Sequence, residues 1–109
     1  MDLAQPVPAP VTDTFIPARE YRDPSWDGGE RERMWPHVWQ MACRVSEIAE
    51  VGQFVAYEIN DESILIVRNG DEPGAISAFY NVCQHRGRRL VDHKSGQLGS
   101  SIVCRFHGW

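Results

Sequence analysis

Two short segments of the chain each carry one cysteine and one histidine. The first reads Cys83-Gln84-His85-Arg86-Gly87, and the second reads Cys104-Arg105-Phe106-His107-Gly108. Each pair follows an apolar stretch that is typical of a strand, and each is followed by a glycine. Two loops that each offer one thiolate and one imidazole can converge on a single inorganic site. The pattern therefore requires a fold that brings the ends of two strands together.

Three interpretations of this pattern compete. The residues could be ordinary packed or exposed side chains, although two pairs in matched surroundings disfavour chance. They could form a structural zinc site, because two Cys and two His also suit tetrahedral zinc; zinc motifs, however, place like ligands together, as in Cys-x-x-Cys. They could hold a Rieske-type [2Fe-2S] cluster, in which two histidines replace two cysteines on one iron. The mixed loops favour the third interpretation.

The middle of the chain predicts a mostly β fold. Short strands separated by turns are typical of an antiparallel sandwich or barrel. The continuous apolar run at residues 64–67 suits a strand that is covered on both faces. We expect strands at 40–45, 52–59, 64–67 and 75–82 and a last one starting at Ile102, with turns at 60–63 and 69–74 and a polar loop at 92–100.

The N-terminal part predicts less regular structure. Four prolines within residues 1–17 indicate an extended arm, which we continue through residue 29 because 23–29 is rich in turn residues. A short helix is expected at 29–35, before Pro36, and the helical segment leading into the β domain is placed at 30–38. The β domain itself is placed at 39–109. An aromatic-rich core cluster is expected from Met34, Trp35, Val38 and Trp39.

Composition argues against several classes of protein. The chain has 109 residues with 11 Lys and Arg against 15 Asp and Glu, a net charge of −4, which disfavours nucleic-acid binding through phosphate charge. No apolar run approaches the roughly 20 residues that a membrane span needs, so no membrane association is expected. We expect no secretory leader either. Three cysteines are too few, and odd in number, for a disulfide framework. A reducing compartment is therefore favoured, and a cytoplasmic location is expected.

The complete motif resembles the Rieske domain of the α subunits of Rieske non-haem iron oxygenases, the aromatic ring-hydroxylating type. Cys83-x-His85-Arg86-Gly87 and Cys104-x-x-His107-Gly108-Trp109 are similar to the two cluster-binding loops of that family. The resemblance runs over roughly residues 30–109. It includes the segments at 30–35, 45–48, 51–54, 64–68 and 78–83.

The resemblance implies a ligand set. Cys83 and Cys104 would bind one iron, and His85 and His107 would bind the other. The charges of two ferric ions, two sulfides and two thiolates cancel, so the cluster is easier to reduce than one with four thiolates. Each bound imidazole keeps a titratable N–H, which lets electron transfer couple to proton uptake. Five further residues are expected around the cluster: Arg86, Gly87, Leu90, Gly108 and Trp109.

Several other residues receive narrower predictions. Respiratory-chain Rieske proteins carry an extra cysteine in each loop, joined as a disulfide, and those positions correspond to Arg88 and Phe106 here. The lower-potential oxygenase or ferredoxin type is therefore favoured. Arg88 and Arg89 form a solvated surface pair or help to dock an acidic electron donor. Cys43 is expected to be a small buried residue, and His37 and His93 are expected to be surface or structural residues.

Two functions from different classes follow from the resemblance. The first is the N-terminal part of an oxygenase α subunit, with no catalytic residue in this chain and the mononuclear ferrous iron in a further C-terminal domain. Such proteins take electrons from a ferredoxin or an NAD(P)H-dependent reductase and assemble as homotrimers or α3β3 hexamers. The second is a stand-alone Rieske ferredoxin, with a structural zinc module as a weaker third possibility.

The position of the motif favours the oxygenase fragment. Strands follow the second ligand pair in Rieske ferredoxins, whereas this chain ends two residues after His107. The expected fold is thus a Rieske-type antiparallel β-sandwich or barrel that is incomplete at its C-terminal end. Because an unclosed sheet leaves an exposed strand edge, we expect the chain made alone to be poorly soluble or to hold its cluster weakly.

Overall fold

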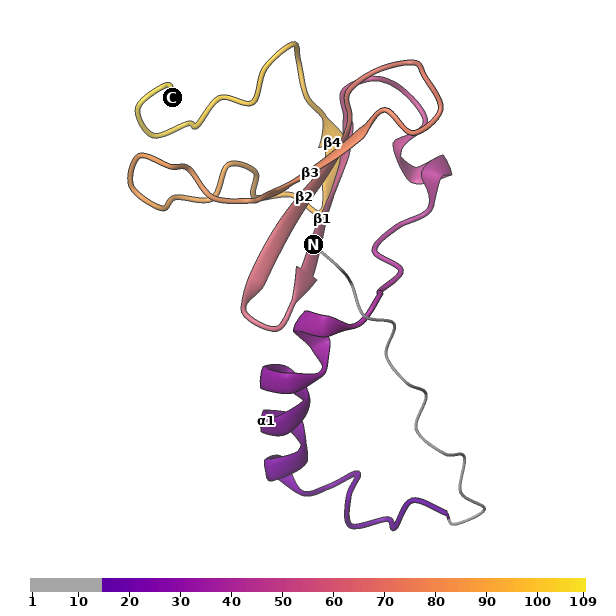
Figure 1. Ribbon diagram of the computed structural model, residues 1–109. Coiled ribbons are helices and arrows are strands. Elements are labelled where there is room, and N and C mark those ends of the chain that lie inside the picture. Colours follow the sequence, from indigo (N-terminus) through magenta and orange to yellow (C-terminus); the bar gives the residue numbers. More distant parts are fainter. Residues whose placement is uncertain (1–14) are drawn as a thin grey trace, which may run out of the picture.

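A computed structural model describes residues 15–109 of the chain. These residues form one helix, two short 3₁₀ turns and a single antiparallel sheet of four strands in the order β3-β2-β1-β4 (Figure 1). The elements are α1 (Pro24–Arg33), η1 (Trp35–His37), η2 (Val45–Ile48), β1 (Gln53–Ile59), β2 (Glu62–Arg68), β3 (Ile76–Tyr80) and β4 (Ser95–Gln97). The mostly antiparallel β prediction is confirmed, and the sheet is not closed into a barrel within the described residues.

Strands β1 and β2 form the central hairpin of the sheet. Ile59 pairs with Glu62, so the connection is the two-residue turn at Asn60 and Asp61. Asn60 has a φ of +50°, a left-handed conformation that asparagine tolerates better than most residues. Strand β2 lies between β1 and β3, and its second half, from Leu65 to Arg68, is buried. The predicted hairpin turn is confirmed at Asn60 and Asp61, although Glu62 and Ser63 belong to β2. The predicted buried run is confirmed from Leu65 onward.

The hydrophobic core lies on one face of this hairpin. Phe54 on β1 is directly opposite Val67 on β2, and Leu65 is two residues away on the same face. These three side chains are buried, and residues from the C-terminal segments pack on them: Val91, Leu98 and Ile102. The core therefore fastens the segments that carry the ligand loops to the sheet.

Leu65 gives a direct test of this core because its side chain is fully buried. Leu65→Ala should lower the free energy of unfolding by about 2–5 kcal/mol, the usual cost of lost burial plus a cavity. Val51→Ala is a matched control, since Val51 is 44% exposed and should cost only about 0.5 kcal/mol. Denaturant unfolding of the cluster-free chain measures both. Equal losses in the two variants would show that Leu65 does not anchor the core.

Strand β4 corrects the prediction of an irregular loop at 92–100. Its backbone pairs with β1: the N–H of Ala56 donates to the carbonyl oxygen of Lys94 at 2.7 Å, and the N–H of Leu98 donates to that of Gly52 at 2.8 Å. A Cβ at Gly96 would come within 3.0 Å of the Phe54 ring, so glycine allows this close packing. All three residues of β4 are exposed, and no apolar alternation marks it.

Two other strand predictions are wrong. Residues 40–45 form no strand, and Gln40 is instead fixed by side-chain bonds, donating to the carbonyl oxygen of Trp35 at 2.8 Å and accepting from the Tyr57 hydroxyl at 2.7 Å. Residues 102–103 are also not in a strand. Both segments have strand-like composition but pair with no strand of the described sheet.

The helix lies earlier than predicted. Instead of 30–38, it runs over α1, and a 3₁₀ turn follows at η1. The carboxylate of Asp23 accepts the backbone N–H of Ser25 at 2.9 Å, and Pro24 occupies the first turn, where its missing N–H costs nothing. The extended arm predicted for 1–29 is therefore wrong from residue 24 onward, and residues 18–22 form hydrogen-bonded turns instead of an extended segment. Its part at residues 1–14, with Pro6, Pro8 and Pro10, lies outside the described residues.

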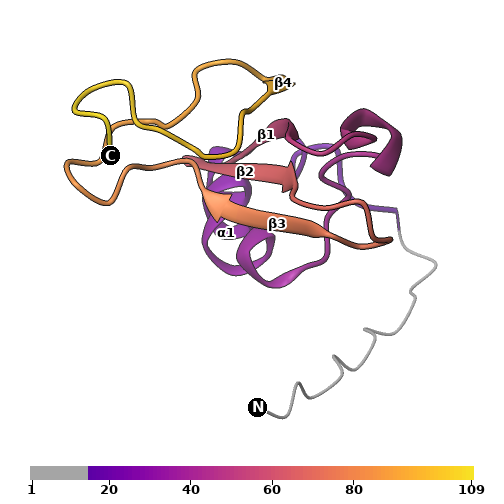
Figure 2. The ribbon, with the colours of Figure 1, turned by 90° about the horizontal axis from the view of Figure 1, so that it is seen from above.

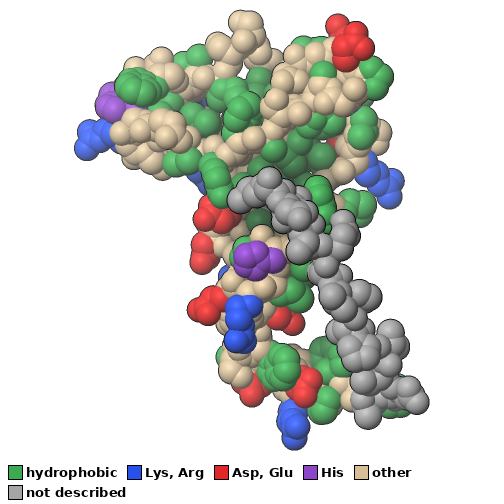
Figure 3. Space-filling view, viewed as in Figure 1, with side chains coloured by type: hydrophobic (Ala, Val, Ile, Leu, Met, Phe, Trp, Pro, Cys, Tyr) green, Lys and Arg blue, Asp and Glu red, His purple; other side chains and the backbone are tan. Residues whose placement is uncertain are grey.

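The aromatic cluster predicted around η1 is not a core. Trp39 is fully exposed and Val38 is 44% exposed, while Met34 and Trp35 are half-buried. Cys43, predicted to be buried, is also only half-buried. In the face shown in Figure 3, charged side chains line the α1 part of the molecule and hydrophobic ones gather over the sheet. No described helix has the length and apolar character that crossing a membrane requires.

Candidate metal centre

The two cysteine–histidine loops project side by side from the same end of the sheet. The first, residues 83–88, follows β3, and the second, residues 104–109, follows the segment after β4. Two views at right angles show both loops reaching in the same direction, away from η2 (Figures 1 and 2). The fold thus brings together two segments that are separated in the sequence, as the ligand pattern predicts.

The first loop is a tight turn closed by backbone hydrogen bonds. The N–H of Cys83 donates to the carbonyl oxygen of Arg88 at 2.7 Å, and the N–H of Gly87 donates to that of Cys83 at 2.9 Å. Gly87 has a φ of +71°, in the left-handed region that favours glycine. A Cβ at this position would meet no protein atom within 4 Å. Its φ, and not crowding by the protein, is the visible reason for this glycine.

The second loop repeats the first at the same offsets. The N–H of Cys104 donates to the carbonyl oxygen of Trp109 at 2.5 Å, and the N–H of Gly108 donates to that of Cys104 at 3.0 Å. Gly108 has a φ of +74°, almost the value at the matching glycine of the first loop. The loops are therefore two copies of one turn, although the histidine lies two residues after the cysteine in one and three in the other.

The four predicted ligand side chains meet as two like pairs. The cysteines are buried, at 6% exposed for Cys83 and 3% for Cys104, and the Cys83 thiol is near enough to Cys104 to lower the pKa of that cysteine. The rings of His85 and His107 lie edge to face with their centroids 4.9 Å apart, and both residues are exposed. The thiols thus face the protein and the imidazoles face solvent.

The surroundings of Cys104 favour its thiolate. The backbone N–H of Phe106 hydrogen-bonds the sulfur and lowers the pKa of Cys104, with further contributions from the Cys83 thiol, the N–H of His107 and the charge of Arg88, although burial acts in the opposite direction. The pKa of Cys43 is raised instead, by burial and by the nearby Glu47 carboxylate. The second loop therefore favours the anionic form of Cys104.

This donor set fits a [2Fe-2S] cluster of the Rieske type. Such a cluster needs two thiolates for one iron and two neutral imidazoles for the other, and the side chains pair in that way. Within residues 15–109, no three Cys, His, Asp or Glu side chains gather closely enough to hold one metal ion. The described cysteines and histidines are therefore arranged as one cysteine pair and one histidine pair.

The residues predicted around the cluster show different environments. Trp109 stacks on His85, with the rings 4.8 Å apart and 9° from parallel, and remains 64% exposed. Leu90 is half-buried at the end of the first loop, and Arg86 is exposed within it. Phe106, which the sequence did not single out for this role, packs on His107 at 4.0 Å. Aromatic rings therefore contact both imidazoles.

The two arginines after the first loop are engaged within the chain. Arg88 forms an ion pair with Asp92 at 3.3 Å, and Arg89 forms one with Glu58 on β1. All four side chains are about half exposed, so each pair contributes only about 0–1 kcal/mol to stability. Arg88 and Arg89 are both exposed, as either interpretation requires, and a role in docking an acidic electron donor stays a prediction.

Comparison with known proteins identifies the family. The family model for the Rieske [2Fe-2S] domain matches residues 38–109, most of the chain. The chain belongs to the Rieske [2Fe-2S] domain family. Both ligand loops and all four strands lie within the matched residues. The zinc interpretation is accordingly not favoured, and the domain is of the kind that binds a [2Fe-2S] cluster.

The Rieske domain is similar to those of oxygenase subunits. It is 38% identical over 94 residues to the carnitine monooxygenase oxygenase subunit of Escherichia coli (strain K12), which covers 86% of this chain and 24% of that protein. It is 32% identical to the biphenyl dioxygenase α subunit of Metapseudomonas furukawaii, over 87% of this chain and 20% of that one. The crystal structure of a quaternary ammonium Rieske monooxygenase matches with a TM-score of 0.72 and 31% identity, over 83% of this chain and 24% of that one. The chain spans about a quarter or less of these relatives.

Proposed function

We propose that this chain is the electron-transfer domain of a Rieske oxygenase α subunit. Cys83 and Cys104 would ligate one iron of the cluster, and His85 and His107 the other. The observation that carries the proposal is the pairing of buried thiol with thiol and exposed imidazole with imidazole across two copies of one turn. Similarity to oxygenase subunits of several substrate types supports the same assignment.

The cysteines and the histidines would have different roles in such a centre. The bound cluster would supply a site that accepts and donates one electron at a time. The buried cysteines keep solvent away from the thiolate side. Exposed histidines offer a ring N–H to solvent or to a partner, where proton transfer can accompany the electron. Electrons would therefore enter and leave at the histidine edge.

The whole protein would be an oxidoreductase that uses O₂. A mononuclear ferrous iron would be held in a further domain, and electrons would come from a ferredoxin or an NAD(P)H-dependent reductase. Assembly as a homotrimer or α3β3 hexamer in the cytoplasm fits the same proposal. Its substrate class stays broad, because the relatives include a carnitine monooxygenase and a biphenyl dioxygenase. Aromatic hydrocarbon oxidation is one option within that range.

Anaerobic redox titration tests the proposed electron transfer. The chain reconstituted with iron and sulfide should take up one electron per cluster, and its visible absorption should bleach and recover on reoxidation. Supplied with a reductase, NADH and O₂, it should oxidise no carnitine or biphenyl by itself, because no residue of this chain is proposed as catalytic. Substrate hydroxylation by the chain alone, or absence of a one-electron step, would contradict the proposal.

The longer coding sequence separates the oxygenase from the stand-alone ferredoxin. An in-frame continuation past Trp109 that encodes two histidines and a carboxylate able to hold ferrous iron is expected for the oxygenase. An authentic stop codon there would favour the ferredoxin, whose cluster chemistry would be the same.

A further inference from the structure

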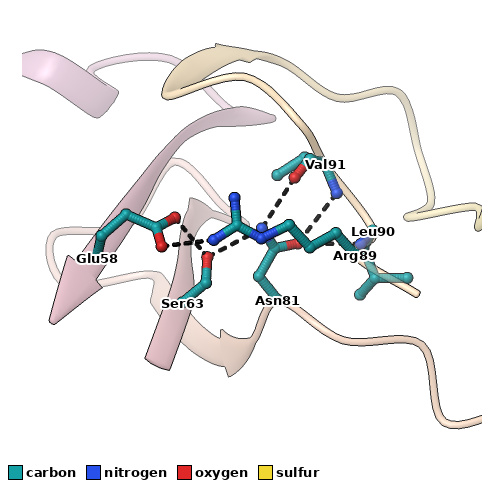
Figure 4. Close-up of polar contacts among 6 residues, drawn as sticks. All are labelled: Glu58, Ser63, Asn81, Arg89, Leu90 and Val91. Carbon is teal, nitrogen blue, oxygen red and sulfur yellow. Dashed lines mark hydrogen bonds and ion pairs between the residues drawn. The ribbon is translucent and has the colours of Figure 1, made fainter. Parts of the chain in front are cut away.

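Asn81 is a buried polar residue that lies between the end of β3 and the first ligand loop. It is 3% exposed, and its side chain makes four hydrogen bonds (Figure 4). Its Nδ2 donates to the Ser63 hydroxyl at 3.1 Å and to the Val91 carbonyl oxygen at 2.9 Å. Its Oδ1 accepts the backbone N–H groups of Leu90 and Val91, at 3.1 and 3.0 Å.

This bonding uses the full capacity of a carboxamide. The amide nitrogen has two donors and the oxygen two lone pairs, and all four are engaged. The backbone N–H of Asn81 also donates to the Ser63 carbonyl oxygen at 2.8 Å, so the residue is fixed to β2 from both its backbone and its side chain. No other residue type of this size offers two donors and two acceptors in the same positions.

A second connection starts from the same few residues. Arg89, next to Leu90, forms an ion pair with Glu58 on β1. The Ser63 hydroxyl donates to Glu58 at 2.7 Å, and this bond together with Arg89 lowers the pKa of Glu58. The contacts therefore form a closed ring (Figure 4). Arg89 contacts Glu58, Glu58 accepts from Ser63, Ser63 accepts from Asn81, and Asn81 donates to Val91, two residues after Arg89.

The ring closes the base of the first ligand loop. Residues 83–88 lie between Asn81 on one side and Leu90 and Val91 on the other, so the amide joins the two ends of this loop. The amide thus holds this loop to the sheet independently of the loop's own backbone hydrogen bonds.

We propose that Asn81 is a positioning residue for the cluster. It holds the first ligand loop on the sheet, so that Cys83 and His85 face the second loop before any metal is bound. This inference rests on the proposed function for its effect on the cluster, although the clamp itself exists without one. Preorganisation of this kind lowers the ordering cost of binding and fixes ligand geometry.

The clamp can be tested first in the cluster-free chain. Amide hydrogen exchange at Leu90 and Val91 should be faster in Asn81→Ala, because both N–H groups lose their acceptor. Asn81→Asp keeps an acceptor for these groups and should protect them better than alanine does, while losing the donation to Ser63 and Val91. Asn69→Ala is the matched control, since Asn69 also donates from its amide to a serine, Ser77, but is exposed and far from the loops. Equal exchange in all three variants would overturn the clamp.

The reconstituted chain tests the effect on the cluster. Both Asn81 variants should lose iron to a chelator roughly tenfold faster or more than the wild type and the Asn69 control. Their reduced-state EPR lines should also broaden or shift, a signature that lower stability alone would not produce. Faster unfolding with an unchanged EPR spectrum and chelation rate would overturn the positioning role. A wild-type chain that binds no cluster would refute the proposed function, whereas the exchange result would still decide the clamp.

Discussion

Cys104→Ala should reduce the iron and sulfide content of the reconstituted chain to background. Cys104 is a buried residue, 3% exposed, and the backbone N–H groups of its loop, together with the Cys83 thiol, lower its pKa and so favour its anionic form. Removing it leaves a single thiolate at the buried side of the site and an uncompensated positive charge on one iron. Such a loss is not offset elsewhere, because each loop supplies only one cysteine.

Cys43→Ala is the control for this experiment. Cys43 is half-buried, lies in the segment before η2, and has a raised pKa that disfavours its thiolate. Its loss should leave iron and sulfide content within experimental error of the wild type. Retention of the cluster in Cys104→Ala, or a similar loss in both variants, would mean that these thiols are not the ligands that we assign.

His85→Cys should lower the reduction potential of the cluster on the order of a few hundred millivolts. Rieske clusters have potentials well above those of clusters ligated by four cysteines, because neutral imidazoles leave less negative charge on the core. A third thiolate adds one negative charge to the site and disfavours reduction. The stacking of Trp109 on the His85 ring would be lost at the same time.

His93→Cys serves as the comparison for the histidine variant. His93 is exposed in the segment that leads into β4, and it is not one of the proposed cluster ligands. Protein-film voltammetry of both variants measures the two potentials directly. An unchanged potential and spectrum in His85→Cys would exclude this histidine as a ligand, whichever way the control behaves.

The sequence predicts the two ligand loops better than it predicts the outer strands and the helix start. The ligand loops are local motifs whose cysteine, histidine and glycine types follow from chemistry and backbone conformation, and the loops come together as expected. The central hairpin was also readable, because its apolar run and its Asn60–Asp61 turn are local signals. These features depend little on distant parts of the chain.

The errors fall where tertiary contacts decide. Strand β4 has no pattern of its own and exists because its backbone pairs with β1 beside Phe54. Residues 40–45 have a suitable composition for a strand but do not join the sheet. The start of α1 was different, since Asp23 followed by Pro24 is a helix-start signal that was interpreted as a turn. The sequence gives no sign of the role of Asn81, because the groups that its side chain hydrogen-bonds come together only in the folded chain.

Pulsed EPR of the reduced cluster tests the central claim most directly. The chain would be produced with ¹⁵N-labelled histidine, reconstituted anaerobically and reduced by one electron. We predict hyperfine couplings from two histidine nitrogens bound to the cluster, with one coupling lost in His85→Cys and both retained in His93→Cys. A cluster signal without histidine coupling, or a chain that binds zinc without sulfide and gives no EPR signal, would contradict the assignment of His85 and His107 as ligands of a Rieske [2Fe-2S] centre.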